Sequence, residues 1–129
     1  MALGVLPPSA DPGRGVRSAE ATAIVRAERT RTVLLLSGEL DLFTRPVLSD
    51  ALSKASASRA GDVVVDLADV TFIDTAIVRA LALSQQLLNR QSRTLTFRSP
   101  SRIAALILHL FGLAGLIKCE QTAPVDVAL

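Results

Sequence analysis

Aromatic residues, cysteine and histidine are scarce in this sequence, and each shortage argues against a class of function. Four phenylalanines are the only aromatic residues among 129, so stacking platforms for single-stranded nucleic acid are not expected. The single Cys119 excludes an internal disulfide and fits a reducing compartment. His109 is also alone, which leaves little material for a zinc site. We expect no nucleic-acid partner, no metal and no cofactor.

Long apolar runs and clustered charges are missing as well. The longest nearly apolar stretch, residues 103–117, falls short of the about 20 residues that a membrane-spanning helix needs. Twelve arginines are scattered singly through the chain, unlike the basic stripe of a DNA-binding face. No basic segment precedes an apolar one in the manner of a secretory signal. These features predict a cytoplasmic protein without membrane insertion.

The sequence contains enough aliphatic residues to form the core of one folded domain. Half of the residues are apolar, and the core must be built from Leu, Val, Ile and Ala. Residues 1–18 are rich in Pro and Gly with little periodicity, and we expect a flexible N-terminal tail there. We assign residues 19–119 to a single domain and residues 120–129 to a loose C-terminal tail.

Runs of β-branched and alternating apolar residues predict four strands, at residues 21–27, 31–37, 63–65 and 94–97. The first two, joined by the polar residues 28–30, are typical of an antiparallel hairpin. We expect residues 37–41 to end the second strand, and residues 66–71 to form a polar break after the third.

Helical periodicity predicts three helices, at residues 45–57, at residues 76–90 and from Pro100 to a stop at Gly112. Thr44 and Ser99 are the expected N-caps of the first and third. The expected apolar faces are, in helix order, Val47, Leu48, Ala51, Leu52 and Ala55; then Ile77, Ala80, Leu81, Ser84, Leu87 and Leu88; then Ile103, Leu106, Ile107 and Leu110. This order of elements predicts an α/β fold. Its mixed sheet has an antiparallel first pair, parallel later strands and helices packed against it.

Enzymatic motifs are absent at the level of the sequence. There is no G-x-S-x-G around any serine and no glycine-rich phosphate loop. A triad that uses His109 would place its base on an apolar helix, so we interpret His109 as a helix-surface or core-edge residue. The irregularly spaced aspartates between residues 62 and 74 are typical of turns and caps. We expect no catalytic residue.

The pair Asp74-Thr75 is the feature with the most functional content. It directly precedes the second predicted helix, where a side-chain oxygen can cap amides that have no intrahelical partner. The same position leaves a hydroxyl exposed at the positive end of the helix. A second loop, residues 38–41, ends in Asp41, and we expect both loops to meet at one end of the sheet.

Three segments together resemble a known family. LSGELDLFTRPVL begins at Leu36, VVVDLADVTFIDTAIV begins at Val63, and LFGLAGLI begins at Leu110. This combination resembles the STAS domain, the fold of bacterial anti-sigma factor antagonists. The resemblance implies a switch protein without enzymatic activity. It binds a serine/threonine kinase of the histidine-kinase-like ATPase type that is also the anti-sigma factor, and it lets go when phosphorylated.

The resemblance also implies roles for particular residues. Thr75 matches the phosphorylated Ser or Thr that follows the F-I-D aspartate. Asp74 would position its hydroxyl and Asp41 would flank it. The expected docking rim is Phe43, Thr44, Ile77, Val78 and Arg79.

Other interpretations stay open, the first of them because the chain has Ala76-Ile77 where antagonists continue with Ser or Thr and then Gly. These are a stressosome-type scaffold component, a soluble STAS subunit docking on the ATPase of a lipid-type ABC transporter, and a sensor with a ligand in its core. Thr75 as a plain helix cap, and a homo-oligomer, are further alternatives.

Overall fold

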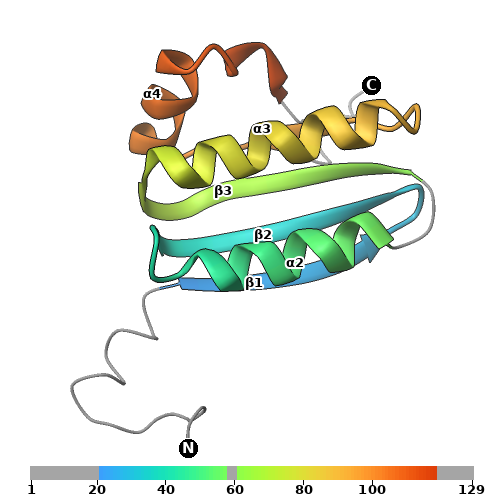
Figure 1. The fold of residues 1–129 in the computed structure, drawn as a ribbon, viewed down its shortest axis with the longest axis horizontal. Coiled ribbons are helices and arrows are strands. Elements are labelled where there is room, and N and C mark those ends of the chain that lie inside the picture. The colour runs from blue at the N-terminus through green and yellow to red at the C-terminus, as the bar shows by residue number, and fades with distance from the viewer. Residues whose placement is uncertain (1–20, 58–60, 119–129) are drawn as a thin grey trace, which may run out of the picture.

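The computed structural model describes residues 21–57 and 61–118, which form one mixed sheet with helices packed on it (Figure 1). In chain order the elements are β1 (Ala21–Glu28), β2 (Arg31–Leu40), α2 (Arg45–Ala57), β3 (Asp62–Ile73), α3 (Thr75–Asn89), β4 (Leu95–Arg98), α4 (Arg102–Leu110), a 3-10 turn (Ala114–Leu116) and β5 (Ile117–Lys118). The sheet order is β1-β2-β3-β4-β5, with β1 and β2 antiparallel and the other pairs parallel. The predicted fold class is confirmed. The predicted tails, residues 1–18 and 120–129, lie outside the described residues.

The two central strands are longer than the sequence predicts. β2 continues through residues 37–40 and ends at Leu40, within the segment expected to end it, whereas β3 runs through the expected polar break at residues 66–71. The expected break in β3 is wrong, and β2 reaches further into the segment expected to end it, because β2 and β3 pair with each other as far as Leu40 and Ile73. The pairing register between the two strands shifts after Leu35 and after Gly38, so the ladder continues past residues that do not fit a regular alternation. The side chains of Asp69 and Thr71 remain exposed, so their polarity costs the strand little.

α2 and α3 lie side by side over one face of the sheet (Figure 1). Between them they bury a cluster of aliphatic side chains against β2, β3 and β4. These are Leu48, Ala51, Leu52 and Ala55 from α2, and Ile77, Val78, Leu81 and Leu88 from α3. Of the predicted faces, Ala80 and Ser84 are only partly buried, and Val47 and Leu87 are exposed. Each lies at the margin of its helix's apolar stripe, where helical periodicity does not decide burial.

The start of α4 differs from the prediction. Ser99 has a left-handed φ of 49°, which is incompatible with a helix cap, and the helix begins at Arg102 instead. Ser101 is the N-cap, and its hydroxyl accepts a hydrogen bond from the Ala104 amide at 3.3 Å. The amide of Ser101 donates to the Leu67 carbonyl oxygen at 3.1 Å, which anchors this start on β3.

The buried face of α4 differs accordingly. Ala104 and Leu108 are buried, whereas Leu106 and Leu110, expected inside, are exposed. The predicted stop at Gly112 is confirmed: its φ is 74°, and Leu113 N donates to Leu108 O at 2.8 Å just beyond it. Across residues 21–57 and 61–118, none of the helices has the length and apolar character needed to cross a membrane.

Candidate functional site at the carboxyl ends of β2 and β3

The two loops that carry Asp41 and Asp74 lie next to each other. β2 and β3 are parallel and end opposite each other, with Leu40 paired to Ile73. One residue further on, the amide of Asp74 donates to the carbonyl oxygen of Leu40 at 3.0 Å. In an open α/β sheet, this carboxyl edge of the parallel strands is where functional sites concentrate. The expected convergence of the two loops is therefore present in the structure.

Asp74 is the N-cap of α3 and Thr75 is its first residue. Asp74 has extended backbone angles, and its Oδ1 accepts a hydrogen bond from the Ile77 amide at 3.0 Å. The carboxylate is thus engaged by the helix itself. The Thr75 side chain is exposed, and no partner for its hydroxyl is found in the described ranges 21–57 and 61–118. The site presents an accessible hydroxyl at the positive end of a well-capped helix.

The Asp41 loop is held by hydrogen bonds between Asp41 and Thr44. Asp41 Oδ1 accepts from the amides of Phe43 and Thr44, each at 3.0 Å. In return, the Thr44 hydroxyl accepts from the Asp41 amide at 2.9 Å and donates to the Glu39 carbonyl oxygen at 2.7 Å. Thr44 therefore organises the loop from inside and is only 6% exposed.

Three large apolar side chains surround this edge and are exposed to solvent. Leu42 is 62% exposed, Phe43 80% and Phe72 46%, and all lie within three residues of the Leu40–Ile73 pair. We call these three residues the apolar rim. Exposed aromatic and aliphatic side chains grouped at one edge are typical of protein-docking surfaces. The prediction included Phe43 but missed Leu42 and Phe72. The only sign of them in the sequence is that each is an apolar residue directly after a segment predicted to end or interrupt a strand.

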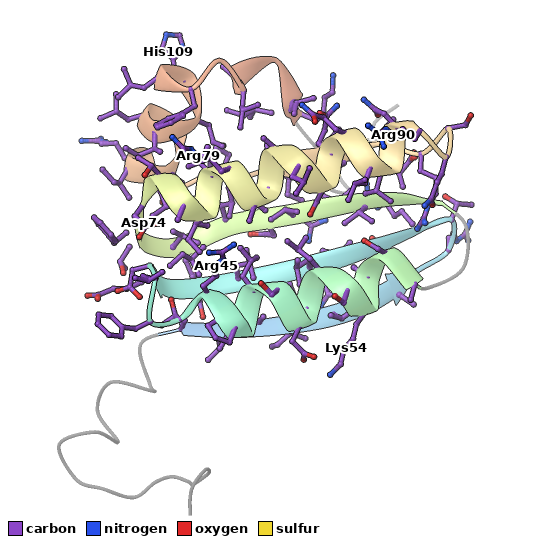
Figure 2. The ribbon with its side chains drawn as sticks, in the orientation of Figure 1. Arg45, Lys54, Asp74, Arg79, Arg90 and His109 are labelled. Carbon is purple, nitrogen blue, oxygen red and sulfur yellow. The ribbon has the colours of Figure 1, made fainter. Side chains whose placement is uncertain are left out.

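Two arginines belong to the same end of the molecule. Figure 2 shows Asp74 at the end of the sheet, with Arg45 from the start of α2 and Arg79 from α3 on either side of it. Both arginines are exposed. Arg79 follows Thr75 by four residues, the spacing at which helix side chains meet.

Three predicted rim residues do not reach the surface. Thr44, Ile77 and Val78 are buried, so their side chains support the site from within and cannot form its outer surface. The alternation of burial on α3 explains this, because Ile77 and Val78 face the sheet while Thr75 and Arg79 face solvent. Of the predicted set, Phe43, Thr75 and Arg79 are exposed and Asp41 is half-buried.

The single histidine lies apart from this edge. His109 is exposed near the end of α4, away from Asp74 (Figure 2), which agrees with the predicted helix-surface position. Among the residues whose structure is described, no three His, Cys, Asp or Glu side chains are grouped to hold a metal ion.

The family assignment follows from comparison with known proteins. The family model described as "Mlab, STAS domain" matches residues 23–118, which is most of the chain. The chain belongs to the STAS domain family. No curated protein matches it.

Solved STAS structures share the fold at low sequence identity. An anti-sigma factor antagonist from Mycobacterium paratuberculosis is 23% identical, with a TM-score of 0.69 over 84% of this chain and 92% of that one. The antagonist SpoIIAA in its unphosphorylated form is 18% identical, with a TM-score of 0.62 over 82% and 93%. The phosphorylated form of the Bacillus cell fate determinant SpoIIAA is 17% identical, with a TM-score of 0.57 over 84% and 100%. At these identities the likeness shows the fold.

Proposed function

We propose that this STAS domain is a non-enzymatic, cytoplasmic anti-sigma factor antagonist controlled by phosphorylation of Thr75. Its partner is a serine/threonine kinase of the histidine-kinase-like ATPase type that also serves as the anti-sigma factor. The unphosphorylated domain docks on this kinase through the apolar rim, and the phosphorylated domain is released. The observation that carries the proposal is the exposed Thr75 hydroxyl at the start of α3, beside an exposed apolar surface. The antagonist names of the structural neighbours agree with it.

The fold can accept a phosphate at Thr75 without unfolding. Phosphorylation adds about −1.5 to −2 charges at neutral pH. The first turn of a helix stabilises negative charge, and Arg79 stands one turn further along the same side of α3. The capping bond from Ile77 N to Asp74 Oδ1 uses neither the Thr75 side chain nor its amide.

The docked complex would not accept the same charge. A partner that covers the apolar rim must also approach Asp41 and Asp74, because the two loops share one edge of the sheet. A phosphate added there brings a third negative group into a surface that docking removes from water. Unpaired charge is costly in such a surface, so release follows while the domain stays folded.

The replacement of glycine by Ile77 does not obstruct this site. The Ile77 side chain is buried in the core under α3. A partner that approaches Thr75 therefore meets the helix backbone and the exposed side chains, and not the Ile77 side chain. The departure from the antagonist pattern changes the core and leaves the hydroxyl accessible.

Phosphorylation with the cognate kinase and ATP, followed by phosphopeptide mapping, tests the proposal. We expect label on Thr75 that disappears in Thr75→Ala. Thr75→Glu should abolish kinase binding in a pull-down while the melting temperature stays close to that of the wild type. Ser53→Glu is the control, because Ser53 is exposed on α2, apart from the start of α3 and from the apolar rim. Label on other residues only, or unchanged binding of Thr75→Glu, would refute the switch.

A second candidate is docking on the ATPase of a lipid-type ABC transporter without phosphorylation. The matching family model is described by the name Mlab, so it does not single out antagonists. The apolar rim suits this role equally, because docking would need Phe43 and not the Thr75 hydroxyl. In that case an ABC ATPase co-purifies, Phe43→Ala abolishes the association, and Thr75→Ala leaves it unchanged.

A further inference from the structure

The outer edge of β1 offers a second interaction surface, remote from Thr75 in the sheet order. β1 is the terminal strand, and within residues 21–57 and 61–118 no strand pairs with its outer side. An edge of this kind presents a row of unpaired N–H and C=O groups. β1 contains no proline, its charged residues Arg26 and Glu28 pair with each other near its end, and its Ile24 is 58% exposed.

A shallow groove runs along this edge between β1 and α2. Its lining is Ala23, Val25, Val47, Asp50, Ala51 and Lys54. Four of the six lining residues are apolar, and the two valines among them are partly exposed. At the margin, Lys54 Nζ lies 3.2 Å from Asp50 Oδ2, and both side chains remain about two-thirds exposed. The groove therefore combines an open strand edge, an apolar strip and one charge of each sign.

We propose that a second copy of this chain occupies the groove by pairing its β1 antiparallel to this one, about a two-fold axis at Ile24. The two sheets then continue into each other. In this register Ile24 meets the partner's Ile24 on the face opposite the helices. On the helix side, Ala23 meets the partner's Val25, so a small apolar side chain faces a larger one.

Strand spacing places the two α2 helices in contact. α2 packs on both β1 and β2, and an axis midway between these two strands would lie half a strand spacing, about 2.4 Å, inward of β1. The two β1 strands add about 4.8 Å between them, which puts the α2 axes about 10 Å apart. Packed helices stand about 8–10 Å apart. The dimer would therefore repeat across its axis the side-by-side packing of α2 and α3 seen within one copy (Figure 1).

The charges on α2 are self-complementary about the same axis. Asp50 and Lys54 lie one turn apart and line the groove together with Ala23 and Val25. In the proposed dimer, the axis at Ile24 passes between the two charges. It sets Asp50 against the partner's Lys54 and Lys54 against the partner's Asp50. An interface between identical surfaces requires this kind of complementarity.

Sedimentation velocity and light scattering of the full chain over a range of concentrations test the proposal. The wild type should form a concentration-dependent dimer. Lys54→Asp and Asp50→Lys, each alone, set like charges against each other in both symmetry-related pairs. Each should raise the dimer dissociation constant about tenfold or more. An equimolar mixture of the two variants should recover a heterodimer, because one then presents two acidic side chains and the other two basic ones.

Two further variants separate this interface from effects on folding. Ile24→Lys sets two lysines together at the axis on an exposed strand position, and it should abolish the dimer with unchanged circular dichroism. Ser53→Asp adds charge on the exposed side of α2 outside the groove lining and should leave the dimer intact.

A wild type that stays monomeric at every concentration overturns the proposal. A dimer that survives both Ile24→Lys and Lys54→Asp overturns it as well. Thr75→Ala should dimerise normally, which separates this proposal from the phosphorylation switch.

Discussion

The amide of Asp74 donates a hydrogen bond to the carbonyl oxygen of Leu40 at 3.0 Å. This bond joins the residue that caps α3 to the last residue of β2, so the loops after β2 and β3 share one edge of the sheet. The apolar rim, the Asp41 loop and the Thr75 hydroxyl are brought together by that single relationship. Four predictions test the parts of the arrangement and the fold that supports it.

Asp74→Ala should lower the free energy of unfolding by about 1 kcal/mol. The substitution leaves the Ile77 amide without the oxygen that caps it at 3.0 Å. Chemical denaturation measures the change. Asp74→Asn keeps a capping oxygen and should restore most of the stability, while Asp69→Ala, at an exposed position of β3, should have little effect. Equal losses for Asp74→Ala and Asp74→Asn would contradict a capping role.

Thr44→Val should lower the free energy of unfolding by about 1–3 kcal/mol, because it removes the buried hydroxyl and both of the hydrogen bonds that this hydroxyl makes to the loop backbone. The Thr44 hydroxyl bridges the Asp41 amide and the Glu39 carbonyl oxygen from a buried position. The Asp41 loop should also loosen, which amide hydrogen exchange of Phe43 would report. Thr44→Ser retains the hydroxyl and should lose much less. If valine is as well tolerated as serine, the hydroxyl does not hold the loop.

Phe43→Ala and Phe97→Ala form a matched pair at the two extremes of exposure. Phe43 is 80% exposed, so its truncation should change stability by less than about 0.5 kcal/mol. Phe97 is fully buried, so its truncation should cost about 3–5 kcal/mol. Denaturant titration separates the two. At a temperature where both variants are folded, Phe43→Ala should weaken partner binding more than Phe97→Ala does. A Phe43→Ala variant that still binds the partner would argue against docking through the apolar rim.

Gly61→Ala should destabilise the domain by more than about 1 kcal/mol. Gly61 has a φ of 140°, and an added Cβ would lie 2.4 Å from the carbonyl oxygen of Thr30. The nearest atoms that this Cβ would meet all belong to the backbone of Thr30 and Arg31, which cannot move aside as a flexible side chain could. Gly115→Ala is the control, since an added Cβ there would meet nothing within 4 Å. A thermal melt of both variants decides the matter, and similar melting temperatures would be the contrary result.

Local pattern was sufficient for the parts of the fold that neighbouring residues determine. The hairpin of β1 and β2, the bounds of α2 and the stop of α4 at Gly112 all follow from alternation, periodicity and turn chemistry. The cap at Asp74 belongs to the same class, because its bond to the Ile77 amide spans only three residues. For such elements the interacting groups are close in the sequence, so the sequence displays them directly.

Sequence pattern gave wrong predictions where contacts with segments distant in the sequence outweigh the local conformational preference. Residues 66–71 look like a break, yet pairing with β2 keeps them extended and their polar side chains stay in solvent or find a partner. Asp66 Oδ2, for example, accepts a hydrogen bond from Arg98 Nε of the neighbouring strand at 2.8 Å. On α4, contact with β3 selects Ala104 and Leu108 for burial and leaves Leu106 and Leu110 exposed.

The sequence by itself determined the fold class, the capped helix start and the presence of a hydroxyl at Thr75. Only the tertiary structure decided which side chains around that hydroxyl face solvent. It buried Thr44, Ile77 and Val78, and it exposed Leu42 and Phe72 beside Phe43. The physical reason is that a cap is made by groups a few residues apart, whereas burial depends on which distant segments pack against a side chain. The ladder between β2 and β3 supplies those segments here, and it ends at the Leu40–Asp74 hydrogen bond.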